Sequence, residues 1–263
     1  MTLSLPVITY HGVSDQKAAY AGADHYRVTL STFIRHMQLI ESGGFHPITF
    51  KHIKSGAPLP ENPMIITFDD GEENNYSEAL PVLRRFRMSA VFFIISGNID
   101  QIGWMKEHQI KELAQAGMEI GSHSVSHRFL SNLPETDLRD ELRNSKKSLE
   151  HASGEEVVSL ALPGGRGSKM VRLHGYESGY QFLATSEPGI NQDGFDPFKI
   201  QRWAMTESLS DQKLRSILTG DPRVIAASQR RYRVGTRLKA IFGDELYHKI
   251  WTLAASVKLG ATA

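Results

Sequence analysis

Short apolar runs alternate along the chain with longer segments whose apolar residues recur every three or four positions. The short runs are rich in β-branched and aromatic residues and predict buried strands, and the longer segments predict amphipathic helices. The predicted strands are residues 5–11, 64–68, 90–95, 118–122, 157–162, 180–186 and 199–205. The predicted helices are residues 30–44, 76–86, 105–117 and 135–154. Strands that alternate with helices indicate an α/β fold with a parallel sheet or a barrel.

The pattern changes near residue 222. Residues 228–260 are predicted to be helical, basic at first and then apolar. We therefore expect an α/β domain at residues 1–222 and a helical C-terminal extension at residues 223–263. A basic helical segment can pack on the body of the protein or face an acidic membrane surface, so a peripheral membrane contact is one prediction for the extension.

Composition narrows the chemistry and the location. The chain has 263 residues, a net charge of +1 and no cysteine. The small charge indicates no nucleic-acid partner, and any metal must be held by His, Asp or Glu because cysteine is absent. The first residues, MTLSLPVITYHGVSD, lack the basic and apolar regions of a signal peptide. No apolar run reaches the ~18 residues of a membrane span, so we expect a cytoplasmic protein.

Polar side chains gather where predicted strands end. Asp69 and Asp70 follow one strand, and His123 and His127 follow another. Because the carboxyl ends of barrel strands form one rim, these residues, and His11 after a third strand, are expected to converge. If the chain turns helical after residue 122, both imidazoles face the same way, which is a common spacing for metal ligands.

A divalent cation at this rim would offset the repulsion between the two aspartates. One carboxylate could then bind the metal while the other stays available as a base. The alternatives are structural: an aspartate at a strand–helix junction often caps the helix, and two histidines four residues apart also occur by chance. The histidines and the aspartates together favour the metal site.

Two motifs then indicate a family. TFDDG at residues 67–71, followed by NNYSEALPVL at 74–83 and GMEIGSHSVSH at 117–127, resembles the polysaccharide deacetylase family, or NodB-homology domain. The resemblance covers about residues 5–205. It implies a distorted (β/α) barrel and removal of acetyl groups from N-acetylated, sometimes O-acetylated, sugars. By position, Asp69 resembles the general base, and Asp70, His123 and His127 resemble the metal ligands. The family's metal is usually zinc, with cobalt or nickel in some members.

Weaker matches suggest further site residues. LALPGGRGS at 160–168 stands where the family has Arg-x-Pro-Tyr, but Arg166 follows Pro163 and the tyrosine is absent. Backbone N–H groups near Gly164, Gly165 and Arg166 could hold an oxyanion, although a plain glycine-rich turn is the alternative.

Tryptophans and one arginine complete the predicted site. In IQRWAM (200–205), Arg202 is predicted to orient Asp69, and Trp203 to line a sugar or acetyl pocket unless it belongs to the core. Trp104 and Tyr10 are further candidates for sugar contacts at the rim.

One departure from the family pattern concerns the general acid. The family usually has a Leu-x-His motif near the end of the barrel, whereas the comparable stretch here, LRSILTGD at 214–221, has no histidine. Loss of a general acid is worth about 10²–10⁴-fold in rate and does not by itself abolish activity. His11 is the substitute candidate, and His174, on a predicted helix, is the second.

These observations predict a metal-dependent hydrolase that removes an acetyl group, most simply an N-acetyl group, from a sugar, oligosaccharide or polysaccharide precursor. The rival is a carbohydrate- or partner-binding domain that keeps the metal but has weakened catalysis. A glycosidase ranks third, because its paired carboxylates need no histidine pair. A cytoplasmic enzyme would meet a nucleotide sugar, a lipid-linked glycan or a short oligosaccharide.

Overall fold

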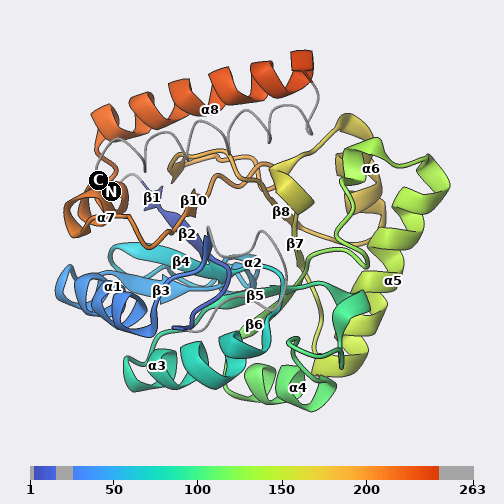
Figure 1. Ribbon diagram of the computed structural model, residues 1–263, viewed down its shortest axis with the longest axis horizontal. Helices are drawn as coiled ribbons and strands as arrows, with labels where there is room; N and C mark the ends of the chain where they lie inside the picture. Colours follow the sequence, from blue (N-terminus) through green and yellow to red (C-terminus); the bar gives the residue numbers. More distant parts are fainter. Residues whose placement is uncertain (1–2, 16–25, 243–263) are drawn as a thin grey trace, which may run out of the picture.

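The computed structural model describes residues 3–15 and 26–242, with side chains through residue 236. A curled parallel sheet lies at the centre, and helices cover its outer side (Figure 1). The predicted fold class, a distorted (β/α) barrel, is confirmed. The strands of the main sheet are β2 (Val7–Tyr10), β3 (His46–Ile48), β4 (Pro63–Phe68), β5 (Val91–Ile94), β6 (Glu119–Ser122), β7 (Ser159–Ala161), β8 (Phe182–Ala184) and β10 (Trp203–Ala204).

All pairings in this sheet are parallel, in the order β10-β2-β4-β5-β6-β7-β8, with β3 beside the first half of β4. A separate antiparallel pair joins β1 (Ser4–Leu5) to β9 (Asn191–Gln192). The helices are α1 (Leu30–Ser42), α2 (Phe50–Lys54), α3 (Leu80–Arg85), α4 (Glu107–Gln115), α5 (Glu135–Ser153), α6 (Lys169–Glu177), α7 (Asp211–Leu218) and α8 (Pro222–Phe242).

Residues 200–204 bring the two edges of the sheet together. Ile200 forms a parallel bridge with Ala184 at the end of β8. Three residues later, Trp203 pairs with Ile8 of β2 at the opposite edge. This one short segment therefore contacts the first and the last strand of the curl, and it carries Arg202 between its two pairings.

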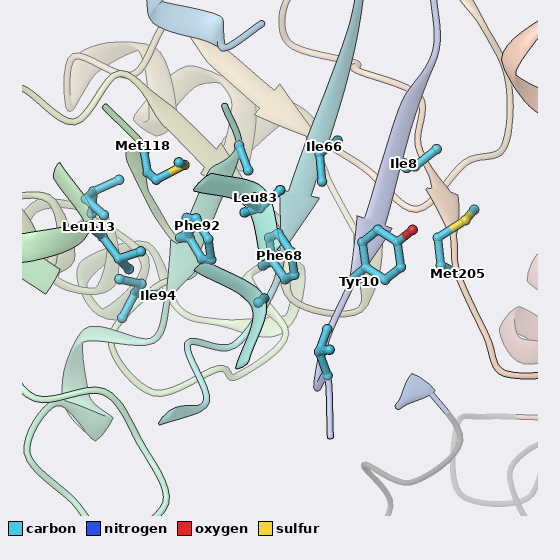
Figure 2. Packing of buried hydrophobic residues seen from close by; sticks show 14 of the residues in the cluster. Ile8, Tyr10, Ile66, Phe68, Leu83, Phe92, Ile94, Leu113, Met118 and Met205 are labelled. Atoms are coloured by element: carbon cyan, nitrogen blue, oxygen red, sulfur yellow. The ribbon is translucent and has the colours of Figure 1, made fainter. Parts of the chain in front are cut away.

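The alternation of side chains along the strands separates two apolar layers. The outer layer joins the sheet to the surrounding helices, and Figure 2 shows Tyr10, Phe68 and Phe92 in it. The rings of Phe68 and Phe92 stack with centroids 4.6 Å apart. The inner layer comes almost entirely from the strands and includes Ile65 and Phe93. Gly121 is required there, because a Cβ at this position would lie 2.5 Å from the Phe93 ring.

Pro81 changes the helix predicted at residues 76–86. The chain forms a wide π-helical turn at Asn75–Ala79, in which the N–H of Leu80 bonds to the carbonyl of Asn75, before α3 begins. Proline lacks an N–H and its ring clashes with the carbonyl four residues earlier, so a regular α-helix cannot run through this position.

Three further features differ from the predicted pattern. The later strands are shorter than predicted, since β7 and β8 have three residues each. The stretch 214–221, compared above with the Leu-x-His motif, lies mainly in α7. β3 and α2 were not predicted, and each is only a few residues long.

The helix α8 follows α7 after a short turn at residues 219–221 and lies along one side of the molecule, at the top of Figure 1. Val224 and Ile225 pack against the outer apolar layer, whereas Arg230, Arg231 and Arg233 are exposed. No described helix is long and apolar enough to cross a membrane. The remainder of the predicted extension, residues 243–263, lies outside the described residues, and the division at residue 222 stays a prediction.

Candidate active site

Strand β4 aims Asp69 into the curl of the sheet. Ile65 belongs to the inner apolar layer, and Thr67, two residues on, is buried and hydrogen-bonded across to Thr9 of β2. The same alternation continues for one more residue, so Asp69 also points inward. Its N–H donates to the carbonyl of Tyr10 at 2.9 Å, which extends the β2–β4 pairing past the end of the strand.

Asp69 forms a buried, bidentate ion pair with Arg202. Nη1 of Arg202 lies 2.7 Å from Oδ1 of Asp69, and Nη2 lies 2.9 Å from Oδ2. Only 1% of the Arg202 side chain and 6% of the Asp69 side chain are exposed. Burial by itself raises the pKa of Asp69, but the charge of Arg202 and its hydrogen bonds outweigh burial and hold that pKa well below its ordinary value. Asp69 is therefore ionised at neutral pH.

Asp70 points elsewhere because the backbone turns at this residue. Its φ is +77°, in the left-handed region, and Gly71 follows with φ +88°. Only glycine is compatible with this second position, where a Cβ would lie 2.9 Å from the Ile94 side chain. The Asp70 carbonyl accepts a hydrogen bond from the N–H of Ile95 at 3.1 Å, which ties the turn to the end of β5. The two adjacent aspartates thus face different partners.

Asp70 meets His123 and His127. Oδ1 of Asp70 lies 3.5 Å from Nε2 of His123 and 3.6 Å from Nε2 of His127. The three potential ligand atoms all lie within 4.8 Å of one another. Asp70 and His123 are buried, whereas 43% of the His127 side chain is exposed. The group is thus open to solvent on the His127 side.

The protonation of His123 suits a metal ligand. Its Nδ1 lies 2.8 Å from the carbonyl oxygen of Ala161, which can only accept, so Nδ1 carries the proton and Nε2 presents a lone pair towards Asp70. Burial lowers the pKa of His123 from 6.5 to about 4, so the ring is neutral at pH 7. One carboxylate and two imidazoles form a donor set used for zinc and similar divalent metals, and these residues fit such an ion.

A tight turn, and not a helix, presents the two imidazoles. The condition considered for the sequence, a helical turn after residue 122, is not met: Ser124 and His127 both have positive φ, at +65° and +58°. The carboxylate of Glu141, on α5, accepts hydrogen bonds from the backbone N–H groups of Val125 and Ser126 at 2.8 and 3.0 Å. The side chain of Ser126 also donates to Glu141. This carboxylate stabilises the turn in a way that the spacing of the histidines could not reveal.

The two candidates for the general acid, His11 and His174, lie in different places. His11 directly follows Tyr10, whose carbonyl accepts the N–H of Asp69 at 2.9 Å, and its ring stacks on Tyr26 with centroids 4.8 Å apart. Nδ1 of His11 is buried without a hydrogen-bond partner among the described residues. His174 is buried on α6 beside Glu177 and Glu135, at 2.8 and 3.3 Å, between α5 and α6, and it does not join the group.

The two tryptophans also separate. Trp203 is 5% exposed in the outer apolar layer, and its indole N–H donates to the carbonyl of Gly189 at 2.7 Å. The structure thus gives Trp203 the core position, as it does Tyr10. Trp104 is half-buried and precedes Met105, whose N–H bonds to the carbonyl of Gly71 at 3.1 Å. Trp104 therefore lies close to the turn that carries Asp70.

The glycine-rich turn after β7 lines a cavity on the β7–β8 side of the sheet. Gly164 and Gly165 have φ of +62° and +71°, and the Arg166 guanidinium lies over the Phe129 ring, 4.4 Å from its centroid. All three residues line a cavity of about 570 Å³. Among the predicted site residues, Asp69, Asp70, His123, His127 and Arg202 thus form one group, with His11 and Trp104 at its edge.

Some contributors carried no recognisable signal in the sequence. The hydroxyl of Thr9 accepts a hydrogen bond from Nη1 of Arg202 at 2.8 Å, and the carbonyl of Ala161 positions His123. A threonine in a strand is ordinary, and a backbone carbonyl is invisible in a sequence. For the contact between Thr9 and Arg202, the available clue was that Thr67 and Asp69, two residues apart on one strand, face the same side of the sheet.

The fold and this group of side chains define a class of protein: a curled parallel barrel with an Asp-His-His group at the carboxyl ends of its strands. Residues 56–183 match the family model described as Polysaccharide deacetylase. The chain is 31% identical over 210 residues to YxkH of Bacillus subtilis, which is named for polysaccharide deacetylases, and the match covers 78% of this chain and 73% of that protein. The chain belongs to the polysaccharide deacetylase family.

Other relatives agree with this assignment. A peptidoglycan-N-acetylglucosamine deacetylase of Bacillus cereus is 29% identical over 167 residues, which cover 62% of this chain and 72% of that protein. The crystal structure of a Bacillus cereus polysaccharide deacetylase superposes with a TM-score of 0.75 at 25% identity, over 82% of this chain and 69% of that one. A Streptococcus pyogenes deacetylase solved with acetate shares the fold, with a TM-score of 0.75 at 19% identity, over 83% of this chain and 99% of that one.

Proposed function

We propose that the protein is a metal-dependent hydrolase that removes the acetyl group from an N-acetylated sugar. The observation that carries the proposal is the pair of adjacent aspartates with separate partners. Asp70 faces two imidazoles, and Asp69 is held ionised by Arg202. A domain that only bound carbohydrate would have no need for a buried carboxylate beside the metal ligands.

Asp70, His123 and His127 would hold the metal, which we propose to be zinc, with cobalt and nickel as alternatives. When bound, such a cation supplies Lewis-acid chemistry: it polarises the acetyl carbonyl and lowers the pKa of water from 15.7 towards about 7. Asp69 would accept the proton of the attacking water. Arg202 fixes both oxygens of this carboxylate, which orients it but also lowers its basicity, so a water of lowered pKa suits it.

The leaving amine needs a proton, and His11 is the proposed donor. It directly follows Tyr10, whose carbonyl accepts the N–H of Asp69, whereas the second candidate, His174, lies beside Glu135 and Glu177. Of the predicted oxyanion donors, Gly165 already donates its N–H to the carbonyl of Leu162 at 2.7 Å, and Arg166 donates to that of Pro163 at 3.5 Å. We therefore propose only the N–H of Gly164 as support for the oxyanion, and Trp104 as a contact to the sugar. Hydrolysis then yields the free amine and acetate.

The relatives suggest the substrate class. The Bacillus cereus relative is named for N-acetylglucosamine in peptidoglycan, and an Escherichia coli relative, 26% identical over 142 residues, for poly-β-1,6-N-acetyl-D-glucosamine. We propose an N-acetylglucosamine unit as the reacting group here. The cytoplasmic location stays a prediction, and it would favour precursors over exported polymers.

The test combines metal content with acetate release. We expect the purified protein to bind about one equivalent of a divalent transition metal and to release acetate from N-acetylglucosamine oligomers after metal loading. His127→Ala removes one of three ligands and should lose most of the metal and the activity together. The exposed His151, on α5, provides the matched control His151→Ala. Wild-type protein that is folded but has no metal affinity would contradict the Asp-His-His assignment, and metal binding without acetate release would favour the binding domain.

We further propose that the outer face of α8 contacts anionic lipid. The helix carries six basic and no acidic residues, and Arg230, Arg231 and Arg233 are exposed on it. Basic residues near an anionic membrane contribute about 1 kcal/mol each. The contact would bring a lipid-linked substrate close to the site.

Replacing these three arginines by glutamine should weaken binding to anionic vesicles by on the order of 10–100-fold in low salt. A vesicle sedimentation assay with phosphatidylserine measures this effect. The matched control replaces three other exposed arginines: Arg84 and Arg85 of α3, and Arg87, two residues past its end. Equal binding by wild type and both variants, or no binding by wild type, would leave α8 as a packing helix only.

A further inference from the structure

A cavity of about 570 Å³ lies between the glycine-rich turn after β7 and α8, and its described lining includes none of Asp70, His123 and His127. Tyr232 and Thr236 of α8 form one wall, and the start of α6 forms another. Its volume lies within the ~300–1,000 Å³ typical of small-ligand sites. The proposed reaction uses only the glycine-rich turn at its edge, so most of the cavity has no assigned role.

Two backbone contacts link the cavity to the reacting groups. Leu162 lines it and directly follows Ala161, whose carbonyl holds His123. Thr185 also lines it, and the Thr185 carbonyl accepts a hydrogen bond from Nε of Arg202 at 2.9 Å. A ligand that filled this cavity would therefore extend away from the acetyl-bearing end of a substrate on the β7–β8 side.

The walls are basic. Arg166, Lys169, Arg172 and Lys199 line the cavity, and Glu187 is the single carboxylate among the described lining residues. Glu187 pairs with Lys199 at 3.0 Å, and Arg172 pairs with Asp196 at 2.7 Å on the surface. The positive side chains come from three places in the chain: the glycine-rich turn, the start of α6 and the segment before β10.

The wall formed by α8 shares this charge environment. Burial raises the pKa of Tyr232, Glu187 raises it further, and Lys199 and Arg166 oppose that rise. The phenol therefore lies among the same charged groups. Phe198 adds an apolar surface to the lining, so the cavity combines cations with aromatic rings.

We propose that this cavity binds a phosphoryl group carried by the substrate, a proposal that rests on the deacetylation proposed above. A carboxylate can be satisfied by one arginine, whereas a phosphoryl group carries up to two charges on three acceptor oxygens and suits several cations from different elements. The substrate would place its acetamido sugar at Asp70, His123 and His127 and its phosphate in the cavity. Nucleotide-linked and lipid-linked sugars share this chemistry.

Two substrates that differ only in the phosphoryl group test the proposal: N-acetylglucosamine 1-phosphate and N-acetylglucosamine. With the metal-loaded full chain, kcat/KM for acetate release should favour the phosphorylated sugar by about tenfold or more, the size expected of one charge-assisted hydrogen bond. The double variant Lys169→Gln/Lys199→Gln should lose this preference. Lys111→Gln, an exposed lysine on α4, should keep it.

Calorimetric titration with the same two sugars separates this proposal from the proposed function. Equal kcat/KM for both sugars in wild type, or a preference that survives the double substitution, overturns the phosphoryl site while deacetylation stands. Lysine-dependent binding of the phosphorylated sugar without acetate release supports the site and overturns deacetylation. UDP-N-acetylglucosamine and a short polyprenyl diphosphate N-acetylglucosamine then identify the carrier by their kcat/KM. If inorganic phosphate stimulates the neutral sugar without competing with the phosphorylated one, the cavity binds a free anion and the substrate proposal is overturned.

Discussion

Asp69→Asn is expected to keep its metal and to lower kcat for acetate release by about 10²-fold or more. The substitution preserves the volume of the side chain and an oxygen that can accept from Arg202, but it removes the carboxylate that takes the proton. KM should change little, because substrate binding does not depend on that charge. Asp70→Asn should behave in the opposite way and lose metal affinity and activity together, since it removes the anionic ligand.

A metal titration paired with an acetate assay measures both variants. Asp140→Asn, an exposed aspartate on α5, is the matched control and should retain both properties. If Asp69→Asn loses metal while Asp70→Asn keeps it, the two roles are reversed. If both variants keep metal and full activity, the adjacent aspartates are structural. Thermal unfolding of each variant shows whether a loss of activity reflects a loss of the fold.

Arg202→Met is expected to destabilise the protein by about 3–5 kcal/mol at pH 7, because it leaves the buried Asp69 carboxylate without its partner. Methionine keeps the length of the side chain and removes all the donors to Asp69, Thr9 and the Thr185 carbonyl. Urea unfolding in the presence of a chelator measures this free energy without a contribution from bound metal.

A second pair calibrates this result. Arg35 and Asp211 lie 2.9 Å apart, much like Arg202 and Asp69, but their side chains are 46% and 45% exposed. Arg35→Met should therefore cost no more than about 1 kcal/mol. In the double variant Arg202→Met/Asp69→Asn, the unpaired charge is gone, so the loss should be smaller than the sum of the two single losses. Additive losses, or equal losses at Arg202 and Arg35, would show that the buried pair is not coupled as the structure indicates.

The sequence pattern was sufficient to predict the fold and the convergence of residues that are distant in sequence. Parallel strands have one carboxyl rim, so Asp69, Asp70, His123 and His127 could be expected near one another before any coordinates. The contact between Arg202 and Asp69 was expected from a resemblance in a short motif, and the structure has this contact. Their roles in binding and catalysis stay predictions that the experiments above address.

The sequence pattern did not predict the local backbone geometry. Nothing in GSHSVSH shows that Ser124 and His127 take positive φ, because the cause is a carboxylate on α5, Glu141, that binds the turn from outside. Trp203 could belong to the core or to a pocket, and only its contact with Gly189 decides for the core. The strand predicted at residues 199–205 is only two residues long in the structure. The segment pairs at its two ends with two sheet edges that are distant in sequence.

The segment at residues 200–204 has a consequence for biosynthesis. Arg202 bonds to Asp69 across 133 positions of sequence and to Thr9 across 193. On a ribosome, the aspartates and both histidines are therefore made long before the residue that neutralises and orients Asp69. A nascent chain that ends before residue 200 would hold Asp69 without its cation, and it could join neither edge of the sheet to the other through this segment. The proposed base would thus be oriented only after residues 200–204 have joined the barrel.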